Sequence, residues 1–273
     1  MVENTDAKII AVFCDFENVA LGVRDAKYAE FDIAKVLERL LLKGNIVVKK
    51  AYCDWARYTD YKAAMHEASF ELIEIPHLRQ SGKNSADIRM VVDALDLCYT
   101  KEHVDTFVIV SGDSDFSPLV SKLRENNKTV IGVGVKQSTS DLLISNCDEF
   151  IYYDDLVRRG KSKAKTAKNR GKRKPAPTRQ VKDLHSPEDK KQEAWDLIVE
   201  TYEALLEERG EEEKIWGSMI KQALKRRKPG FNESYYGFKT FGALLEEAET
   251  QGILELERDQ KSGGFIIKKA HTF

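Results

Sequence analysis

Apolar residues gather in short continuous runs over the first 155 residues, and polar or amphipathic segments separate the runs. The runs are rich in Val, Ile and Phe, which is typical of strands buried on both faces of a sheet. Between them, 31–43, 85–101 and 116–126 carry apolar residues at helical spacing. This alternation predicts an α/β fold, a mostly parallel sheet with helices on both faces. The predicted strands are 8–14, 46–53, 70–75, 106–110, 129–135 and a short edge strand, 149–153.

The pattern changes from residue 187 onward, where amphipathic segments come first and apolar runs come last. Residues 188–209 and 215–226 each predict a helix, and 235–251 contains a third. Two strands, 253–257 and 264–268, then predict a hairpin through 259–263. Three helices followed by a two-stranded wing is the order of a winged helix-turn-helix domain.

Positive charge is concentrated between these two segments. The formal net charge of the whole chain is −1, yet 156–182 holds twelve Lys or Arg and no Asp or Glu. The rest of the chain therefore has 32 basic against 45 acidic residues. With almost no apolar residue after Val157, this stretch predicts a flexible linker. It serves either as a solubilising spacer or as a tether for a polyanion such as RNA.

Several classes of protein are excluded or disfavoured. No apolar run approaches the ~20 residues of a membrane helix, and the first residues lack the pattern of a signal peptide. The four cysteines form no CxxC pair, so we expect a reducing, cytoplasmic location and no structural zinc site. The chain has no G-x-x-x-x-G-K-[ST], G-x-S-x-G or HExxH motif, and its Gly132-Val133-Gly134 lacks the third glycine of a dinucleotide fingerprint.

Acidic residues follow two of the predicted strands. Asp15 follows the first strand, Asp113 and Asp115 follow the fourth, and Asp87 lies in the first turn of a predicted helix. Each alone is explained as a helix cap or a partner of a helix dipole. Parallel sheets, however, bind ligands beyond the carboxyl ends of their strands. We therefore predict that these carboxylates form one cluster, which we call the four-aspartate site.

An all-oxygen ligand set favours Mg²⁺ or Mn²⁺ over zinc. Such a metal can orient a water molecule and stabilise charge on a phosphodiester. Asn18 either positions a phosphate through its amide or is an Asx-turn residue. Lys83 and Arg89 flank Asp87, where they either bind substrate phosphate or are solvated surface charges.

Residues 6–156 resemble the NYN domain, the LabA-like branch of the PIN-like nuclease superfamily. The resemblance implies a PIN-like, Rossmannoid sheet and a metal-dependent ribonuclease, for which RNA is favoured over DNA by the resemblance alone. It also implies metal and catalytic roles for Asp15, Asp87, Asp113 and Asp115, with Asn18 as a further catalytic residue. The motifs that carry it are 13–18 (FCDFEN), 83–87 (KNSAD), 109–116 (IVSGDSDF), 130–134 (VIGVG) and 147–150 (CDEF).

Residues 190–270 resemble the OST-HTH domain, also called LOTUS. The resemblance rests on 221–228, 229–233 (PGFNE), 236–246 and 263–265 (GGF). It implies RNA binding, with a protein partner or a homo-oligomer as a further role of this domain. Basic residues beside aromatic ones suit phosphate neutralisation and base stacking. The residues we predict to contact RNA are Arg226, Arg227, Lys228, Tyr235, Tyr236 and Lys239.

The sequence thus predicts a nuclease domain over 6–156, a basic linker over 157–187 and a winged-helix RNA-binding domain over 188–271. The expected function is metal-dependent ribonuclease activity, most simply endonucleolytic, on RNA that the second domain helps to target. Two alternatives stay open. One is a non-catalytic RNA-binding regulator, and the other is a metal-dependent phosphohydrolase or transferase of small nucleotides.

Overall fold

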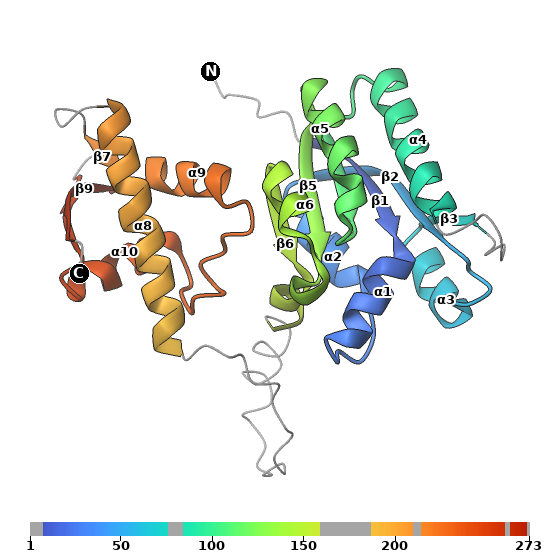
Figure 1. Ribbon diagram of the computed structural model, residues 1–273, viewed down its shortest axis with the longest axis horizontal. Helices are drawn as coiled ribbons and strands as arrows, with labels where there is room; N and C mark the ends of the chain where they lie inside the picture. Colours follow the sequence, from blue (N-terminus) through green and yellow to red (C-terminus); the bar gives the residue numbers. More distant parts are fainter. Residues whose placement is uncertain (1–7, 76–83, 159–186, 210–213, 260–262, 272–273) are drawn as a thin grey trace, which may run out of the picture. The chain divides into compact units, whose positions relative to one another are not determined.

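The computed structural model describes residues 8–75, 84–158, 187–209, 214–259 and 263–271. They belong to two compact units, Met1–Lys165 and Thr166–Phe273 (Figure 1). The predicted basic linker, 157–187, lies almost wholly outside the described residues. Each unit is therefore considered by itself.

The first unit is built on a six-stranded sheet in which every neighbouring pair of strands is parallel. The strand order is β3-β2-β1-β4-β5-β6. This confirms the predicted α/β sheet, and the observed strand ends lie within a few residues of the predicted ones. The strands are β1 (Lys8–Asp15), β2 (Gly44–Cys53), β3 (Glu71–Glu74), β4 (Thr106–Val110), β5 (Thr129–Gly134) and β6 (Glu149–Tyr152).

Both faces of the sheet are covered by apolar packing. Along β1, Ile10, Val12 and Cys14 belong to one buried cluster, and Ala11 and Phe13 belong to another. This alternation follows from the two-residue period of a strand. Helices α1 (Phe16–Asp25), α2 (Ile33–Leu41) and α3 (Thr59–Glu67) pack on the first face. Helices α4 (Ser85–Thr100), α5 (Ser117–Glu125) and α6 (Asp141–Asn146) pack on the second.

Three of these helices, α1, α3 and α6, were not among those predicted from the sequence. Helix α1 starts directly where β1 ends, and the Asp15 side chain caps it by accepting from the Asn18 amide. Helices α3 and α6 are short, with nine and six residues, and each buries a single side chain, Met65 or Leu143. So small a buried face leaves only a weak periodic signal.

The second unit contains, among its described residues, helices α8 (Pro187–Arg209), α9 (Gly217–Arg227) and α10 (Phe241–Thr250). Its antiparallel sheet has the order β7-β9-β8, formed by β7 (Ile215–Trp216), β8 (Leu254–Arg258) and β9 (Phe265–Ala270). Buried residues of all three helices form one core with this sheet. The assignment to the winged-helix fold stays a prediction.

One boundary in this unit was predicted wrongly. Ile215 and Trp216 do not open the second helix; they pair with Ile267 and Ile266 of β9, and helix α9 begins at Gly217. The apolar side chain of Ile215 is compatible with either a helix or a strand, and its pairing with β9 makes this residue part of a strand. The predicted hairpin connection, 259–263, lies partly outside the described residues.

The four cysteines, Cys14, Cys53, Cys98 and Cys147, are all buried, and none forms a disulfide. Burial raises the pKa of each of their thiols. In the part of the chain that the structure describes, no helix is both long and apolar enough to cross a bilayer.

Candidate active site

The candidate site lies at the centre of the parallel sheet, where the strand order reverses. Strand β1 pairs with β2 on one side and with β4 on the other, so the chain leaves β1 in one direction and returns on its opposite edge. Such a switch point opens a crevice beyond the carboxyl ends of the two strands. Asp15 is the last residue of β1, and Asp113 follows the end of β4 at Val110 by three residues.

Asp15 is the most buried of the four aspartates, with 7% of its surface exposed. One carboxylate oxygen accepts from the backbone amide of Asn18 at 3.3 Å, and the other accepts from the Ser111 hydroxyl at 3.0 Å. Burial, followed by repulsion from Asp87 and Asp113, raises the pKa of Asp15 to about 7, against the lowering effect of these two hydrogen bonds. A carboxylate that holds its proton up to neutral pH is typical of a functional site.

Two side chains tie the end of β1 to the loop after β4. The Asn18 side-chain oxygen accepts from the Gly112 amide at 2.9 Å. The Ser111 hydroxyl donates to Asp15 and accepts from the Asp113 amide at 3.2 Å. Gly112 is required here because a Cβ atom at this position would lie 2.5 Å from the Ser138 carbonyl oxygen. These contacts hold the two acidic segments in a fixed relation.

The structure brings the other three predicted aspartates to the same region. Burial and the nearby charges of Asp113, Asp115 and Glu17 raise the pKa of Asp87, which is partly buried in the first turn of α4. Asp113 caps the short 3₁₀ helix Ser114–Phe116 by accepting from the Asp115 amide at 3.0 Å. Asp115 is exposed. The four carboxylates therefore interact electrostatically at one edge of the sheet.

The donor set fits a divalent cation that prefers oxygen. Clustered carboxylates raise pKa values in the absence of a cation, as Asp87 and Asp113 do for Asp15, and Asp113, Asp115 and Glu17 do for Asp87. Within the described residues, however, no group of three or more His, Cys, Asp or Glu side chains is arranged to hold a metal ion. Asp15 and Asp113 instead accept from backbone amides as helix caps.

Three residues of this site were missed in the sequence analysis. Ser111 links Asp15 to Asp113, and its signal was a polar residue directly after the apolar run of β4. Glu17 contributes to the raised pKa of Asp87. Arg57, on the loop after β2, pairs with Glu17 at 2.9 Å. Only the fold could reveal Arg57, because forty residues separate it from Glu17.

The predicted RNA contacts near the site have different placements. Lys83 lies outside the described residues. Arg89 is exposed on α4, and its Nε donates to Asp93 at 2.9 Å. Asp93 also accepts from the Tyr52 hydroxyl at 2.9 Å. Arg89 is therefore engaged in a pair along its own helix.

In the second unit, two of the predicted contacts take part in the packing. Tyr236 is 8% exposed, and its ring lies 5.3 Å from that of Phe231, centre to centre. Arg227 bridges α9 to α8 by donating to Glu200 and Thr201. Tyr235 is half-buried, with the Lys190 ammonium 4.8 Å from its ring centre. The predicted contacts whose side chains are exposed to solvent without such a role are Arg226, Lys228 and Lys239.

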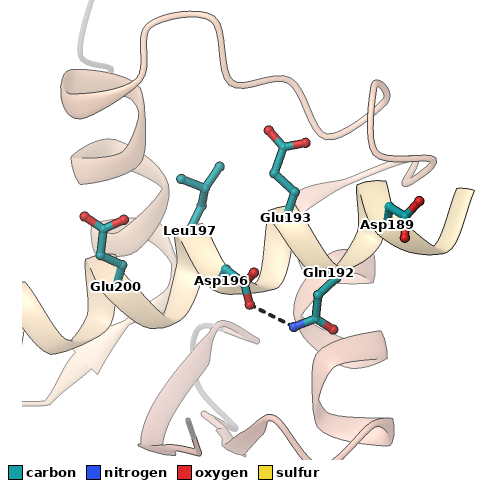
Figure 2. A pocket seen from close by; sticks show the side chains of 6 residues that line it. All are labelled: Asp189, Gln192, Glu193, Asp196, Leu197 and Glu200. Atoms are coloured by element: carbon teal, nitrogen blue, oxygen red, sulfur yellow. Dashed lines mark hydrogen bonds between the residues drawn. The ribbon is translucent and has the colours of Figure 1, made fainter. Parts of the chain in front are cut away.

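Negatively charged side chains line one face of α8. An open hollow of about 350 Å³ is bordered by acidic side chains and Leu197 (Figure 2). Asp196 accepts there from the Gln192 side-chain amide at 2.8 Å. A polyanion is repelled from such a surface. The residues drawn in Figure 2 are Asp189, Gln192, Glu193, Asp196, Leu197 and Glu200.

Comparison with known proteins agrees with the fold of the first unit. The family model described as the NYN domain matches residues 9–154, slightly more than half of the chain. The resemblance predicted for 6–156 is confirmed. NYN domains are part of the PIN-like nuclease superfamily. The match lies within the first unit, and the OST-HTH/LOTUS resemblance of the second unit stays a prediction.

Individual relatives cover only part of the chain. The uncharacterized protein MJ0482 of Methanocaldococcus jannaschii is 29% identical over 46% of this chain and 49% of its own length. The meiosis regulator and mRNA stability factor 1 of Xenopus tropicalis is 24% identical over 54% of this chain, but that covers 9% of the relative. This chain thus spans half or less of these curated relatives. The crystal structure of VPA0982, a protein of unknown function from Vibrio parahaemolyticus, has a TM-score of 0.50 and 28% identity, and covers 56% of this chain and 98% of that one.

Proposed function

The chain belongs to the NYN domain family, and from that premise we propose that it is a metal-dependent ribonuclease. The proposed reaction is hydrolysis of RNA phosphodiester bonds, as an endonuclease, at the four-aspartate site. The observation that carries the proposal is the buried Asp15 carboxylate, which lies at the switch point of the sheet and has a pKa raised to about 7 by burial and by neighbouring carboxylates. A site that concentrates negative charge in this way suits a cation and a phosphate together.

The residues of the chain have separable tasks in this proposal. Asp15 and Asp113 come from the segments at the ends of β1 and β4, and Ser111 holds them in register by bonding both segments. Asp87 and Asp115 complete the set from α4 and from the loop after β4. Asn18 is a positioning residue, because its side-chain oxygen accepts from the backbone amide of Gly112 and so fixes the loop that carries Asp113. No covalent nucleophile is required for hydrolysis by water.

Mg²⁺ or Mn²⁺, when bound, would supply a Lewis acid that neutralises phosphate charge and orients the attacking water. The residues that would hold the ion are Asp15, Asp87, Asp113 and Asp115. The cap of Asp113 uses one carboxylate oxygen, Oδ1, so Asp113 could hold an ion through its other oxygen while it keeps the bond to the Asp115 backbone amide.

The first test compares RNA cleavage in Mn²⁺, Mg²⁺ and EDTA for the unmodified chain and for Asp113→Asn. We expect metal-dependent cleavage of a pool of single-stranded and hairpin RNAs, and loss of that cleavage in Asp113→Asn with RNA affinity retained. Affinity is retained because one carboxylate at an acidic site attracts no phosphate. The measurement is the rate of appearance of internal fragments on a denaturing gel.

A matched control is Asp96→Asn, an exposed aspartate on α4 for which the described residues record no ion pair. It should cleave at the rate of the unmodified chain. Cleavage that persists unchanged in Asp113→Asn would contradict the proposed site. Turnover of small nucleotides that ignores salt concentration would instead favour the phosphohydrolase alternative.

One observation favours a second candidate, the non-catalytic RNA-binding regulator. The four aspartates are not already arranged around a common point within the described residues. A regulator would keep the four aspartates as a cation or phosphate site, and it would bind RNA without cleaving it in the presence of any metal ion. The same gel, combined with a binding measurement, separates this candidate from the nuclease.

We further propose that the second unit binds the RNA backbone through the exposed end of α9. Arg226 and Lys228 both lie there, and both are exposed. Together with the basic linker, such a unit raises the local concentration of RNA at a site that is itself acidic.

Replacing both Arg226 and Lys228 by alanine should weaken RNA binding and reduce its salt dependence. Each phosphate contact to a single strand contributes roughly 0.7 to the slope of log K against log salt, so the double variant should lose about 1.4 from that slope. Fluorescence anisotropy at four salt concentrations measures it. The control is Lys268→Ala, because Lys268 is paired with Glu257 at 2.8 Å. An unchanged slope in the double variant would place the RNA elsewhere.

A further inference from the structure

Helix α4 presents two apolar faces, and only one of them is buried. Met90, Ala94 and Cys98 face the sheet and are 4% exposed or less. On the other side, Ile88 and Tyr99 are 63% and 60% exposed. A surface helix of a globular protein normally has one apolar stripe and a polar opposite side.

The exposed apolar residues of α4 form a continuous stripe. Ile88, Val92, Leu95 and Tyr99 follow one another at steps of four, three and four residues, and Leu95 is partly buried. Alternating steps of four and three are the spacing by which two helices pack along a seam. The other large exposed apolar side chains of the described residues, Leu41, Leu42, Val47 and Leu142, form no such stripe.

The charges beside the stripe on one copy of the chain can pair with those on a second copy. Arg89 and Asp96 are both exposed and seven residues apart, so they lie along the same edge of the stripe. If a second α4 runs antiparallel, Arg89 of each copy faces Asp96 of the other. In a parallel pair related by a two-fold axis along the helices, this edge of one copy faces the other edge of its partner, so Arg89 and Asp96 would not meet. The recorded bond of Arg89 to Asp93 uses only Nε, and the described residues record no ion pair for Asp96.

We propose that this stripe is the interface of a homodimer in which two copies of α4 pack antiparallel across a two-fold axis. A two-fold interface needs a surface that complements itself, which the apolar seam and the Arg89–Asp96 edge provide. The seam is short: a helix of 16 residues is about 24 Å long. It is therefore smaller than the ~800 Å² per partner of a standard stable interface, and the dimer should dissociate on dilution.

The arrangement sets the spacing of the two acidic sites. Asp87 directly precedes Ile88 at the start of α4, so the two copies of Asp87 lie at opposite ends of the seam, no further apart along it than ~24 Å. The inference does not depend on the proposed ribonuclease activity, because dimerisation is measured without substrate.

The test is sedimentation velocity of the full chain over a hundredfold range of concentration, after removal of nucleic acid and in high salt. We expect the mass to rise from that of a monomer to twice that value, and Val92→Asp to keep it at the monomer value throughout. Leu142→Asp is the matched control, since Leu142 on α6 is as exposed as Val92, at 56%, and it should dimerise as the unmodified chain does.

Charge reversal, measured at low salt so that exposed charges are not screened, tests the antiparallel pairing. Asp96→Arg should weaken the dimer at least tenfold, and combining it with Arg89→Asp should restore it, because each copy again offers one charge of each sign. A chain that stays monomeric at every concentration overturns the proposal. So does a Val92→Asp variant that is folded by circular dichroism and still dimerises, which would put the interface on another surface.

Discussion

Asp15→Asn is expected to make the metal-free protein more stable at pH 8 while removing its nuclease activity. Burying this carboxylate among other acids destabilises the folded protein, and its pKa is therefore raised to about 7. Asparagine keeps one oxygen acceptor for the Asn18 amide or the Ser111 hydroxyl and carries no charge. The expected gain in the free energy of unfolding is up to about 4 kcal/mol, the equivalent of the shift from 3.8 to about 7.

The sign of the pH dependence follows from proton binding. Between pH 3.8 and about 7, Asp15 is mostly protonated in the folded state and mostly ionised in the unfolded state. The folded state binds more protons in this range, so its stability falls as the pH rises through it. Asp15→Asn should flatten this part of the curve. The difference between the two proteins should be largest above pH 7 and absent below pH 3.8.

Thermal unfolding in EDTA at several pH values between 4 and 8 measures this effect. For a domain of this size, 1 kcal/mol corresponds to roughly 2–4 °C in Tm. Adding Mg²⁺ or Mn²⁺ should raise the Tm of the unmodified protein and leave that of Asp15→Asn nearly unchanged. Asp93→Asn is the control on α4; it should lower the Tm, because Asp93 accepts from Tyr52 and Arg89. A lower Tm for Asp15→Asn at pH 8 would show that the buried carboxylate stabilises the fold.

Phe16→Ala is expected to destabilise the first unit by about 3–5 kcal/mol. Phe16 is fully buried directly after Asp15, and its ring lies 4.9 Å from Trp55 and 5.1 Å from Tyr61, centre to centre. It also contacts Phe31 edge-on at 5.9 Å. Removing the ring leaves a cavity beneath the first turn of α1, where the Asn18 amide bonds Asp15.

Chemical denaturation followed by tryptophan fluorescence measures this loss, since Trp55 packs against Phe16. Phe16→Leu provides the graded control: it keeps most of the apolar volume and should lose much less. RNA cleavage should fall more in Phe16→Ala than in Phe16→Leu at a temperature where both are folded. Equal stabilities of the two variants would mean that the ring contacts contribute little.

The sheet could be predicted from the sequence because its strands are buried on both faces and read as continuous apolar runs. Helix α1 was missed although Phe16, Val19 and Val23 follow helical spacing. The reason is that no loop separates it from β1, so strand and helix signals merge at Asp15. Asp15, Asp113 and Asp115 could be assigned to one edge because strand ends in a parallel sheet converge there, and the role of the four aspartates as a site stays a prediction. Arg57 and Ser111 act through contacts that only the folded chain creates.

In the second unit, composition predicted a cluster of basic and aromatic side chains but could not divide it between surface and core. Tyr236 and Arg227 are used in packing, the first against Phe231 and the second against α8. Basic residues at a helix end and aromatic residues in a short loop serve either purpose. Which purpose applies depends on the neighbouring helix, whose position no local pattern contains.

The four buried cysteines of the first unit can report transient local unfolding of that unit. A thiol reacts as the thiolate, and burial keeps Cys14, Cys53, Cys98 and Cys147 both protonated and out of reach. An alkylating reagent can modify them only while the structure around each is transiently open. Cys14 lies on the central strand β1, and Cys98 lies near the end of α4. Their separate rates of modification would therefore distinguish fraying of the outer layer from opening of the sheet itself.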